Sequence, residues 1–112
     1  DLDEALKLVS VAMEEAGPLA TLRDSLAVVH LARGNAQAAV EELDAAIADD
    51  PAAIFWFHRA LVQDRLGQPE AAVAALKKAE ELAEGPVEVH PLERPEYERL
   101  RAAVIRPSTS SS

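Results

Sequence analysis

The sequence of 112 residues contains no cysteine and few aromatic residues, with one tryptophan, one tyrosine and two phenylalanines. The absence of cysteine excludes disulfides, thiolate catalysis and cysteine-ligated zinc sites. Basic residues are also scarce, because 11 lysines and arginines face 20 aspartates and glutamates and the formal net charge is −9. A chain with this charge repels nucleic-acid phosphates and anionic lipid surfaces, so we expect neither nucleic acid nor a membrane as a partner.

Long hydrophobic runs are missing as well. The most apolar stretches, residues 26–32 and 52–57, are much shorter than the roughly 18 residues that suggest a membrane-spanning helix. No targeting segment is visible at the N-terminus, and the serine-rich residues 107–112 are expected to form a disordered tail. The composition predicts one soluble domain over residues 1–106, for which the cytoplasm is the favoured compartment.

Helix-forming residues dominate the sequence, which contains 23 alanines and 14 leucines. Residues that break helices divide the chain at even intervals, so we expect an all-α fold built from helices of similar length. The breaks fall at residues 17–18, 34–35, 50–51, 67–69 and 85–86. Asn35, Asp50 and Gln68 occupy the positions where helix N-caps are expected.

The same residue types recur at a spacing of 33 or 34 residues. Every second predicted helix carries a small, a large and a small residue on one face, which lets a neighbouring helix approach closely on either side of the large side chain. The triplets are Ala5, Val9 and Ala12; Ala39, Leu43 and Ala46; and Ala72, Leu76 and Ala79. The period corresponds to one pair of helices.

This pattern resembles the tetratricopeptide repeat over residues 1–84. The first full copy of the signature consists of Arg23, Leu26, Ala27, His30, Gly34, Ala39, Leu43, Ala46 and Pro51. The second consists of Trp56, Arg59, Ala60, Gln63, Gly67, Ala72, Leu76 and Ala79. His30 and Gln63 depart from the family, in which an aromatic residue is usual at that position.

The resemblance implies a right-handed α-solenoid of antiparallel helix pairs. It divides the domain into a half repeat at 1–17, full repeats at 18–51 and 52–85, and a C-terminal capping helix at 94–106. Residues 87–93 are expected to form an extended connector. The capping helix is expected to turn Tyr97, Leu100 and Val104 inward.

In this family the first helices of the repeats line a concave groove that holds a segment of a partner protein. Carrying over the groove-facing positions selects Asp24, Val28, Leu31, Ile54, Phe57, Leu61, Asp64 and Arg65. Most of these side chains are apolar, so the resemblance implies a protein or peptide ligand with apolar anchors. Phe57 is expected to face the groove because Trp56 beside it supplies an aromatic residue for the core. Asp24 is expected to repel a bound carboxylate.

Two other roles remain open. The half repeat lacks its first helix, so its apolar face could serve self-association and make the protein a homodimer or assembly module. This face consists of Leu2, Leu6, Val9 and Met13. The domain could also be the docking module of a larger enzyme or regulator.

No pattern of catalytic residues stands out, so the sequence predicts a protein that is not an enzyme and that needs no cofactor or metal. The three histidines, His30, His58 and His90, lie in different predicted elements and lack the spacing of a metal-binding motif. We expect His30 in a packing layer and His58 on a helix surface. A metal or small-molecule site would require one of these histidines to meet carboxylates in a pocket.

Overall fold

The structure is a computed structural model that describes residues 1–105, and helices account for nearly all of its regular structure. The segments are α1 (Leu2–Ala16), α2 (Ala20–Ala32), α3 (Ala36–Asp49), α4 (Ala53–Arg65), α5 (Pro69–Ala83), the 3-10 turn η1 (Pro91–Glu93) and α6 (Arg94–Ile105). No strand occurs within residues 1–105, so the prediction of an all-α fold is confirmed for them. The predicted tail at 107–112 and the predicted last residue of the capping helix, Arg106, lie outside the described residues.

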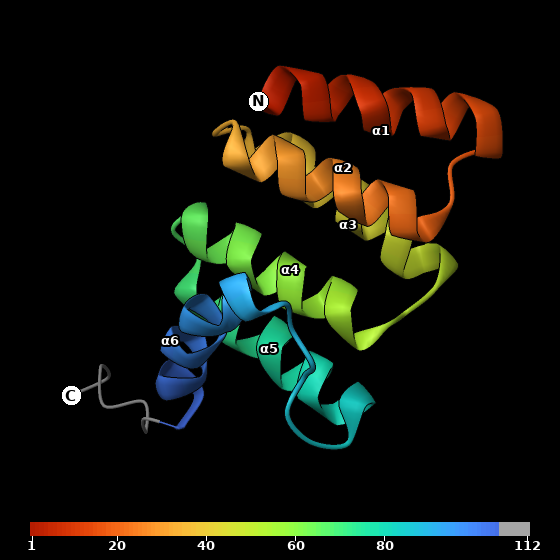
Figure 1. Cartoon of the computed structure of the whole chain (residues 1–112). Helices are drawn as coiled ribbons and strands as arrows, with labels where there is room; N and C mark the ends of the chain where they lie inside the picture. The colour runs from red at the N-terminus through yellow and green to blue at the C-terminus, as the bar shows by residue number, and fades with distance from the viewer. Residues whose placement is uncertain (106–112) are drawn as a thin grey trace.

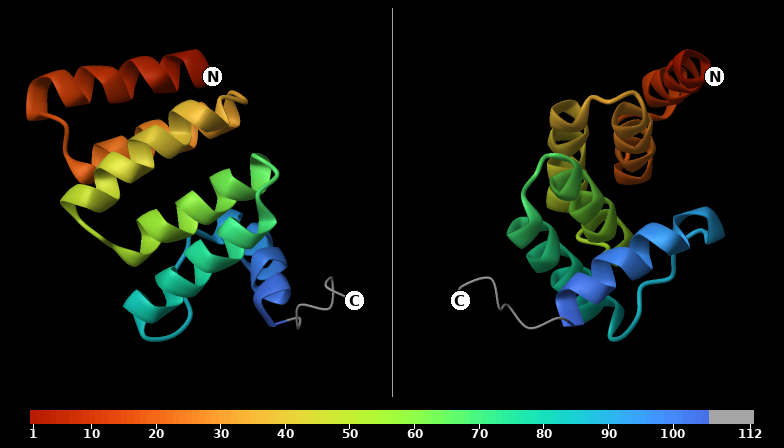
Figure 2. Two further views of the ribbon diagram at one scale, coloured as in Figure 1. Left: turned by 180° about the vertical axis from the view of Figure 1, so that it is seen from behind. Right: turned by 90° about the vertical axis from the view of Figure 1, so that its left-hand side faces the viewer.

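Consecutive helices from α1 to α5 run in opposite directions and lie next to one another (Figure 1). They follow one another along the longest axis of the molecule, whose extents are 51 × 28 × 24 Å. Helix α1 lies at one end and α6 crosses near α4 and α5 at the other, as both views in Figure 2 show. Short turns join the helices from α1 to α5, so each of them packs mainly against its neighbours in sequence.

Polar caps and glycines fix several helix ends where the sequence predicts them. The Asn35 side chain accepts a hydrogen bond from the backbone N–H of Ala38 at 3.3 Å and begins α3, which satisfies one of the unpaired N–H groups of the first turn. Gly34 and Gly67 follow α2 and α4 with φ of 83° and 76°, a backbone conformation that glycine adopts without steric cost. Asp50, by contrast, is the C-cap of α3, and Ala52 is the N-cap of α4. The expectation that Asp50 caps α4 is therefore wrong.

The small-large-small triplets of α3 and α5 form the centre of the core. Ala39, Leu43 and Ala46 are each 0% exposed, and the corresponding residues of α5 are at most 1% exposed. The alanines bring the helix axes close together, while burial of each leucine contributes about 1.5–3 kcal/mol. The triplet of α1 is only half-buried, because α2 is the helix that covers it.

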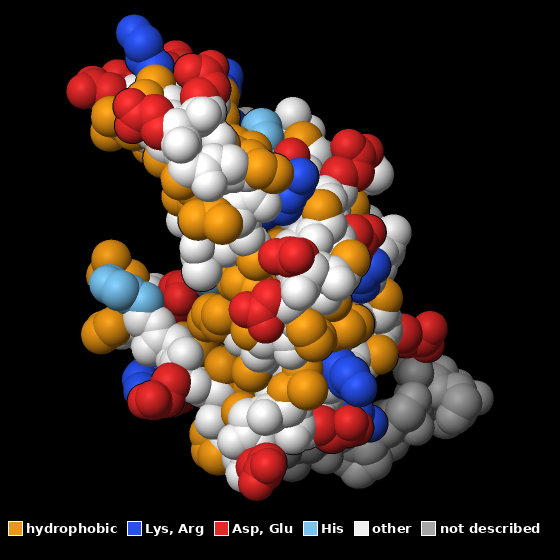
Figure 3. Space-filling view, turned by 90° about the vertical axis from the view of Figure 1, so that its right-hand side faces the viewer, with side chains coloured by type: hydrophobic (Ala, Val, Ile, Leu, Met, Phe, Trp, Pro, Cys, Tyr) orange, Lys and Arg blue, Asp and Glu red, His pale blue; other side chains and the backbone are white. Residues whose placement is uncertain are grey.

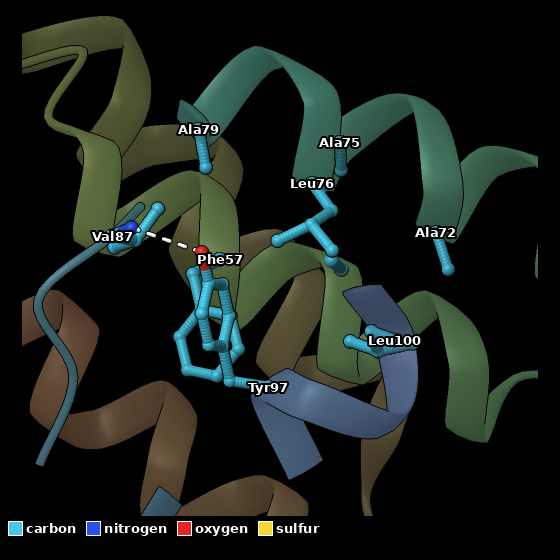
Figure 4. Close-up of a cluster of buried hydrophobic side chains, with 9 residues drawn as sticks. Phe57, Ala72, Ala75, Leu76, Ala79, Val87, Tyr97 and Leu100 are labelled. Carbon is cyan, nitrogen blue, oxygen red and sulfur yellow. Dashed lines mark hydrogen bonds between the residues drawn. The ribbon is translucent and has the colours of Figure 1, made fainter. Parts of the chain in front are cut away.

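Helix α6 closes the core at the C-terminal end (Figure 4). Tyr97 and Leu100 are 4% and 3% exposed, and Val104 packs against the same cluster, so the predicted inward face of this helix is confirmed. The Tyr97 hydroxyl accepts a hydrogen bond from the backbone N–H of Val87 at 3.1 Å and donates one to Glu80 at 2.6 Å. These contacts attach the segment after α5 to α6.

Every residue of α1 is at least partly exposed. Leu6, Val9 and Met13 are half-buried and Leu2 is 41% exposed. Leu8 and Val11, which the sequence analysis did not single out, are 66% and 43% exposed. Within the described part of the chain, none of the helices is both long enough and apolar enough to span a bilayer.

Candidate functional site

A small apolar cleft of about 40 Å³ lies between α2 and α4. Its sides are Val28 and Leu31 from α2 and Leu61 from α4, three of the residues that the sequence analysis assigned to the groove. The remaining lining residues are Ala27, Leu43, Val62, His58 and Glu93. Val28 is 42% exposed, so a partner in solution can reach the cleft. In Figure 3 the surface is hollowed between the upper part of the molecule, which holds α1 and α2 in Figure 1, and a lobe that projects below it.

A cluster of three charged side chains borders this cleft. Nδ1 of His58 lies 2.6 Å from a carboxylate oxygen of Asp24, and Nε2 of the same ring lies 2.5 Å from a carboxylate oxygen of Glu93. Asp24 belongs to α2, His58 to α4 and Glu93 to η1, so the cluster joins three elements. The His58 residue is 8% exposed. The expectation that His58 lies on a helix surface is therefore wrong.

The two carboxylates keep His58 protonated. Burial lowers the pKa of His58, but the hydrogen bonds and negative charges of Asp24 and Glu93 outweigh burial and raise the pKa from 6.5 to about 9. The hydrogen bond from His58 in turn lowers the pKa of Glu93, against the opposing effect of burial. A protonated imidazole whose two N–H groups both donate to carboxylates has no lone pair left to act as a general base. The cluster is suited to binding and not to proton abstraction.

The structure corrects the assignment of Phe57 to an open groove. This residue is 0% exposed and belongs to the core cluster under α6. Its ring and the Tyr97 ring are nearly perpendicular, with centroids 5.5 Å apart, and both belong to the cluster drawn in Figure 4. Trp56, which was expected to be the core aromatic, is half-buried and packs against the same cluster, and the guanidinium of Arg59 lies 5.9 Å from the centroid of its ring.

The other predicted groove residues have different surroundings. Ile54 is half-buried and packs against both core clusters, while Arg65 is exposed in the last turn of α4. Asp64 accepts a hydrogen bond from Arg99 of α6 at 2.8 Å. Glu96 and Asp64 together raise the pKa of Arg99 above its usual value, against a smaller opposing effect of burial. The structure thus brings Val28, Leu31 and Leu61 together, whereas Ile54, Phe57 and Asp64 contact other parts of the chain.

Sequence reasoning missed Glu93 as a functional candidate. The residues before α6 were expected to be an extended connector, but Pro91–Glu93 forms a 3-10 turn that lies against α4 through the contact between His58 and Glu93. No local motif indicates this contact, because its partners are 35 residues apart. A weak signal was present in the pattern His90-Pro91-Leu92-Glu93, in which a polar residue three positions before a glutamate can form a capping box.

Among the described residues, no group of three or more histidine, aspartate or glutamate side chains is arranged to hold a metal ion. His30 is half-buried and His90 exposed, in different elements from His58. No family model matches this chain, and a search of curated proteins finds no match.

Proposed function

We propose that the protein is a non-catalytic interaction module that holds a peptide or helix of a partner protein in the apolar cleft between α2 and α4. The observation that carries the proposal is the exposure of Val28 beside Leu31 and Leu61 at the mouth of the cleft. Exposed apolar side chains at a concave surface favour apolar anchors from a partner.

We further propose that the helices belong to a right-handed α-solenoid of two and a half tetratricopeptide-like repeats with α6 as its cap. The support is the recurrence of equivalent residues in equivalent surroundings, because Ala39 and Ala72, like Leu43 and Leu76, are at most 1% exposed. The repeat spacing also makes Leu61 the counterpart of Val28. The two residues line one cleft, as the groove-facing positions of adjacent repeats would.

The test is a selection of random displayed peptides on the full chain, followed by measurement of their affinities. Val28→Asp should weaken the selected peptides by about tenfold or more, because it introduces an unpaired carboxylate at an apolar contact. Leu82→Asp is the matched control, since Leu82 on α5 and Val28 on α2 are 40% and 42% exposed. Equal affinities for Val28→Asp and the unmodified chain would contradict the proposal.

Self-association is a second candidate, and the exposed apolar side chains of α1 favour it. Leu8 at 66%, Val11 at 43% and Leu2 at 41% exposed are available to a second copy of the chain. Sedimentation over a wide concentration range tests this role. A dimer that Leu8→Glu dissociates and Val28→Asp preserves would support self-association, whereas a monomer at all concentrations would exclude it. The interaction module would serve equally well as the docking domain of a larger enzyme or regulator.

A further inference from the structure

The side chain of Glu93 occupies part of the cleft that the proposed function assigns to a partner. Glu93 is the last residue of the segment 88–93, which we name the strap. The strap follows the buried residue Val87 and leads into α6, where Tyr97 is buried. Figure 2 shows this segment, in blue, on the same side of the molecule as the N-terminus of α1. Glu93 is also one of the residues that line the cleft. The protein therefore covers part of its own candidate site.

Few buried contacts hold the strap in place. Glu88, His90, Pro91 and Leu92 are exposed, with Leu92 at 85%. Val89 is half-buried against the C-terminal core cluster, and the Glu93 side chain is 25% exposed. Moving the strap away from α4 would expose little apolar surface, so the main loss would be the contact between Glu93 and His58.

The strap presents its carboxylate in a fixed geometry. The second carboxylate oxygen of Glu93 accepts a hydrogen bond from the backbone N–H of His90 at 3.3 Å, and the His90 ring accepts one from the backbone N–H of Leu92 at 3.1 Å. These bonds form a capping box at η1. The capping box thus fixes the position of the Glu93 carboxylate at His58, where the acidic side chain of a bound peptide would also lie.

Removal of Glu93 from His58 has two consequences. The Nε2–H of a charged and buried imidazolium loses its acceptor, which is costly unless another acceptor replaces it. The cleft also loses one of its walls. At about 40 Å³ the cleft is much smaller than ordinary ligand pockets of roughly 300–1,000 Å³, so a large apolar anchor requires this wall to move. A purely apolar segment would open the cleft but leave His58 unpaired.

Asp24 has the opposite role from the one expected from the sequence. Its carboxylate receives a hydrogen bond from Nδ1 of His58, so the imidazolium lies between Asp24 and whichever acceptor faces Nε2. A second carboxylate is therefore accepted near Asp24, as the position of Glu93 demonstrates. The acceptor position at Nε2 is open to a partner whenever Glu93 leaves it.

We propose that the strap is an internal competitor for the cleft, and that the partner segment carries an aspartate or glutamate side chain that replaces Glu93 at His58 beside an apolar side chain that enters the widened cleft. The proposal rests on the proposed function, because it specifies the chemistry of the segment bound at the same cleft. The predicted ligand is a segment that contains an aspartate or glutamate side chain next to an apolar side chain.

The experiment compares the unmodified full chain with Glu93→Gln and with Glu88→Gln as the matched control. Glu88 lies in the same strap and is exposed. Random displayed peptides are selected on each chain, and selected sequences are resynthesised with blocked ends so that their only carboxylates are side chains. Peptides from the Glu93→Gln selection should contain an acidic residue beside an apolar one. They should bind Glu93→Gln about tenfold more tightly than the unmodified chain or Glu88→Gln, because the competing charged hydrogen bond is weakened.

Hydrogen exchange provides the second readout on the unmodified chain. Binding of an acidic peptide should increase amide exchange in the strap while amides of α2 and α4 become more protected. Replacement of the peptide's acidic residue by its amide should weaken the binding by about tenfold or more, because the charged hydrogen bond to His58 is weakened.

The outcomes separate this proposal from the proposed function. Selected peptides that depend on Val28 but lack an acidic residue would contradict the proposal that the strap competes with the partner. Peptides that bind all three chains equally would contradict it as well. Either result would still support the proposed interaction module. Acidic peptides that bind without loosening the strap would also overturn it. Failure of all three chains to select any peptide would overturn both proposals.

Discussion

At the scale of single residues, His58 links charge to stability. Two carboxylates raise its pKa to about 9, so the folded chain holds this proton more tightly than the unfolded chain does. The stabilising contribution of His58 is fully present below pH 6.5, the ordinary pKa, and is lost as the pH rises through about 9. Glu93 has the opposite pH dependence. Its pKa is lowered in the folded chain, so its stabilising contribution is lost as the pH falls and the carboxylate becomes protonated. The cluster therefore stabilises the fold most in mildly acidic solution.

We predict that the free energy of unfolding falls between pH 6.5 and 9.5 by on the order of 2–3 kcal/mol, as expected when folding raises the pKa of His58 from 6.5 to about 9. Urea denaturation at a series of pH values measures this change. His58→Gln should remove most of the pH dependence in this window, and Glu93→Gln should reduce it. Glu88→Gln, with an exposed carboxylate, should behave like the unmodified chain. The same slope in His58→Gln as in the unmodified chain would contradict the role of the cluster.

At the scale of helices, packing depends on alanines that leave no room for a larger side chain. Ala72 is 1% exposed, and the neighbouring leucine of its triplet, Leu76, is 0% exposed. Ala74 lies on the same helix, α5, but is exposed. Helix α5 thus contains one alanine, Ala72, buried where helices cross and another, Ala74, exposed to solvent.

We predict that Ala72→Leu destabilises the protein by about 1–3 kcal/mol, because the added atoms overpack a close helix crossing. Ala74→Leu should change stability by less than about 0.5 kcal/mol, as surface substitutions usually do. Chemical denaturation of the two variants measures the difference. An unchanged midpoint for Ala72→Leu would count against the close packing of α4 on α5.

The helices also differ in how well their boundaries were predicted from the sequence. Helix periodicity and the alanine triplets predict α3, α5 and α6 correctly, because these features act within one helix or between neighbours in sequence. The start of α4 was misplaced, since Asp50 is the C-cap of α3 and Ala52 is the N-cap of α4. The 3-10 turn at Pro91–Glu93 was missed because its position depends on His58, which is distant in sequence.

At the scale of the whole molecule, burial is unevenly distributed from one end to the other. Helix α1 packs against α2 and all its residues are at least partly exposed. Helix α4 lies between α3 and α5 and contains Phe57 and Ala60, both 0% exposed. Local opening is expected to be easiest where the fewest apolar contacts are lost.

We predict that the amides of α1 exchange with solvent about tenfold or more faster than those of α4 after correction for intrinsic rates. Hydrogen exchange followed by NMR measures both helices in one experiment. Equal protection at high protein concentration that disappears on dilution would indicate that a second copy covers α1. Equal protection at every concentration would contradict the expected gradient.

Local features of the sequence predict an all-α fold, the breaks between helices and the small-large-small faces that pack together. These features depend on the intrinsic preferences of residues and on spacings of three or four positions, which can be read along the chain. The resemblance to the tetratricopeptide repeat placed Val28 and Leu61 on one candidate surface, and both line the cleft. The apolar sides of the cleft were predictable for that reason.

Contacts between distant segments determine which candidate residues remain accessible and which charged side chains interact. Phe57 and Leu61 share one helix, yet Phe57 is 0% exposed because α6 packs over it, while Leu61 lines the cleft. Asp24, His58 and Glu93 are separated by 34 and 35 residues and interact only after α2, α4 and the strap come together. Burial and long-range electrostatics depend on contacts between distant segments, and such contacts leave no periodic pattern in the sequence.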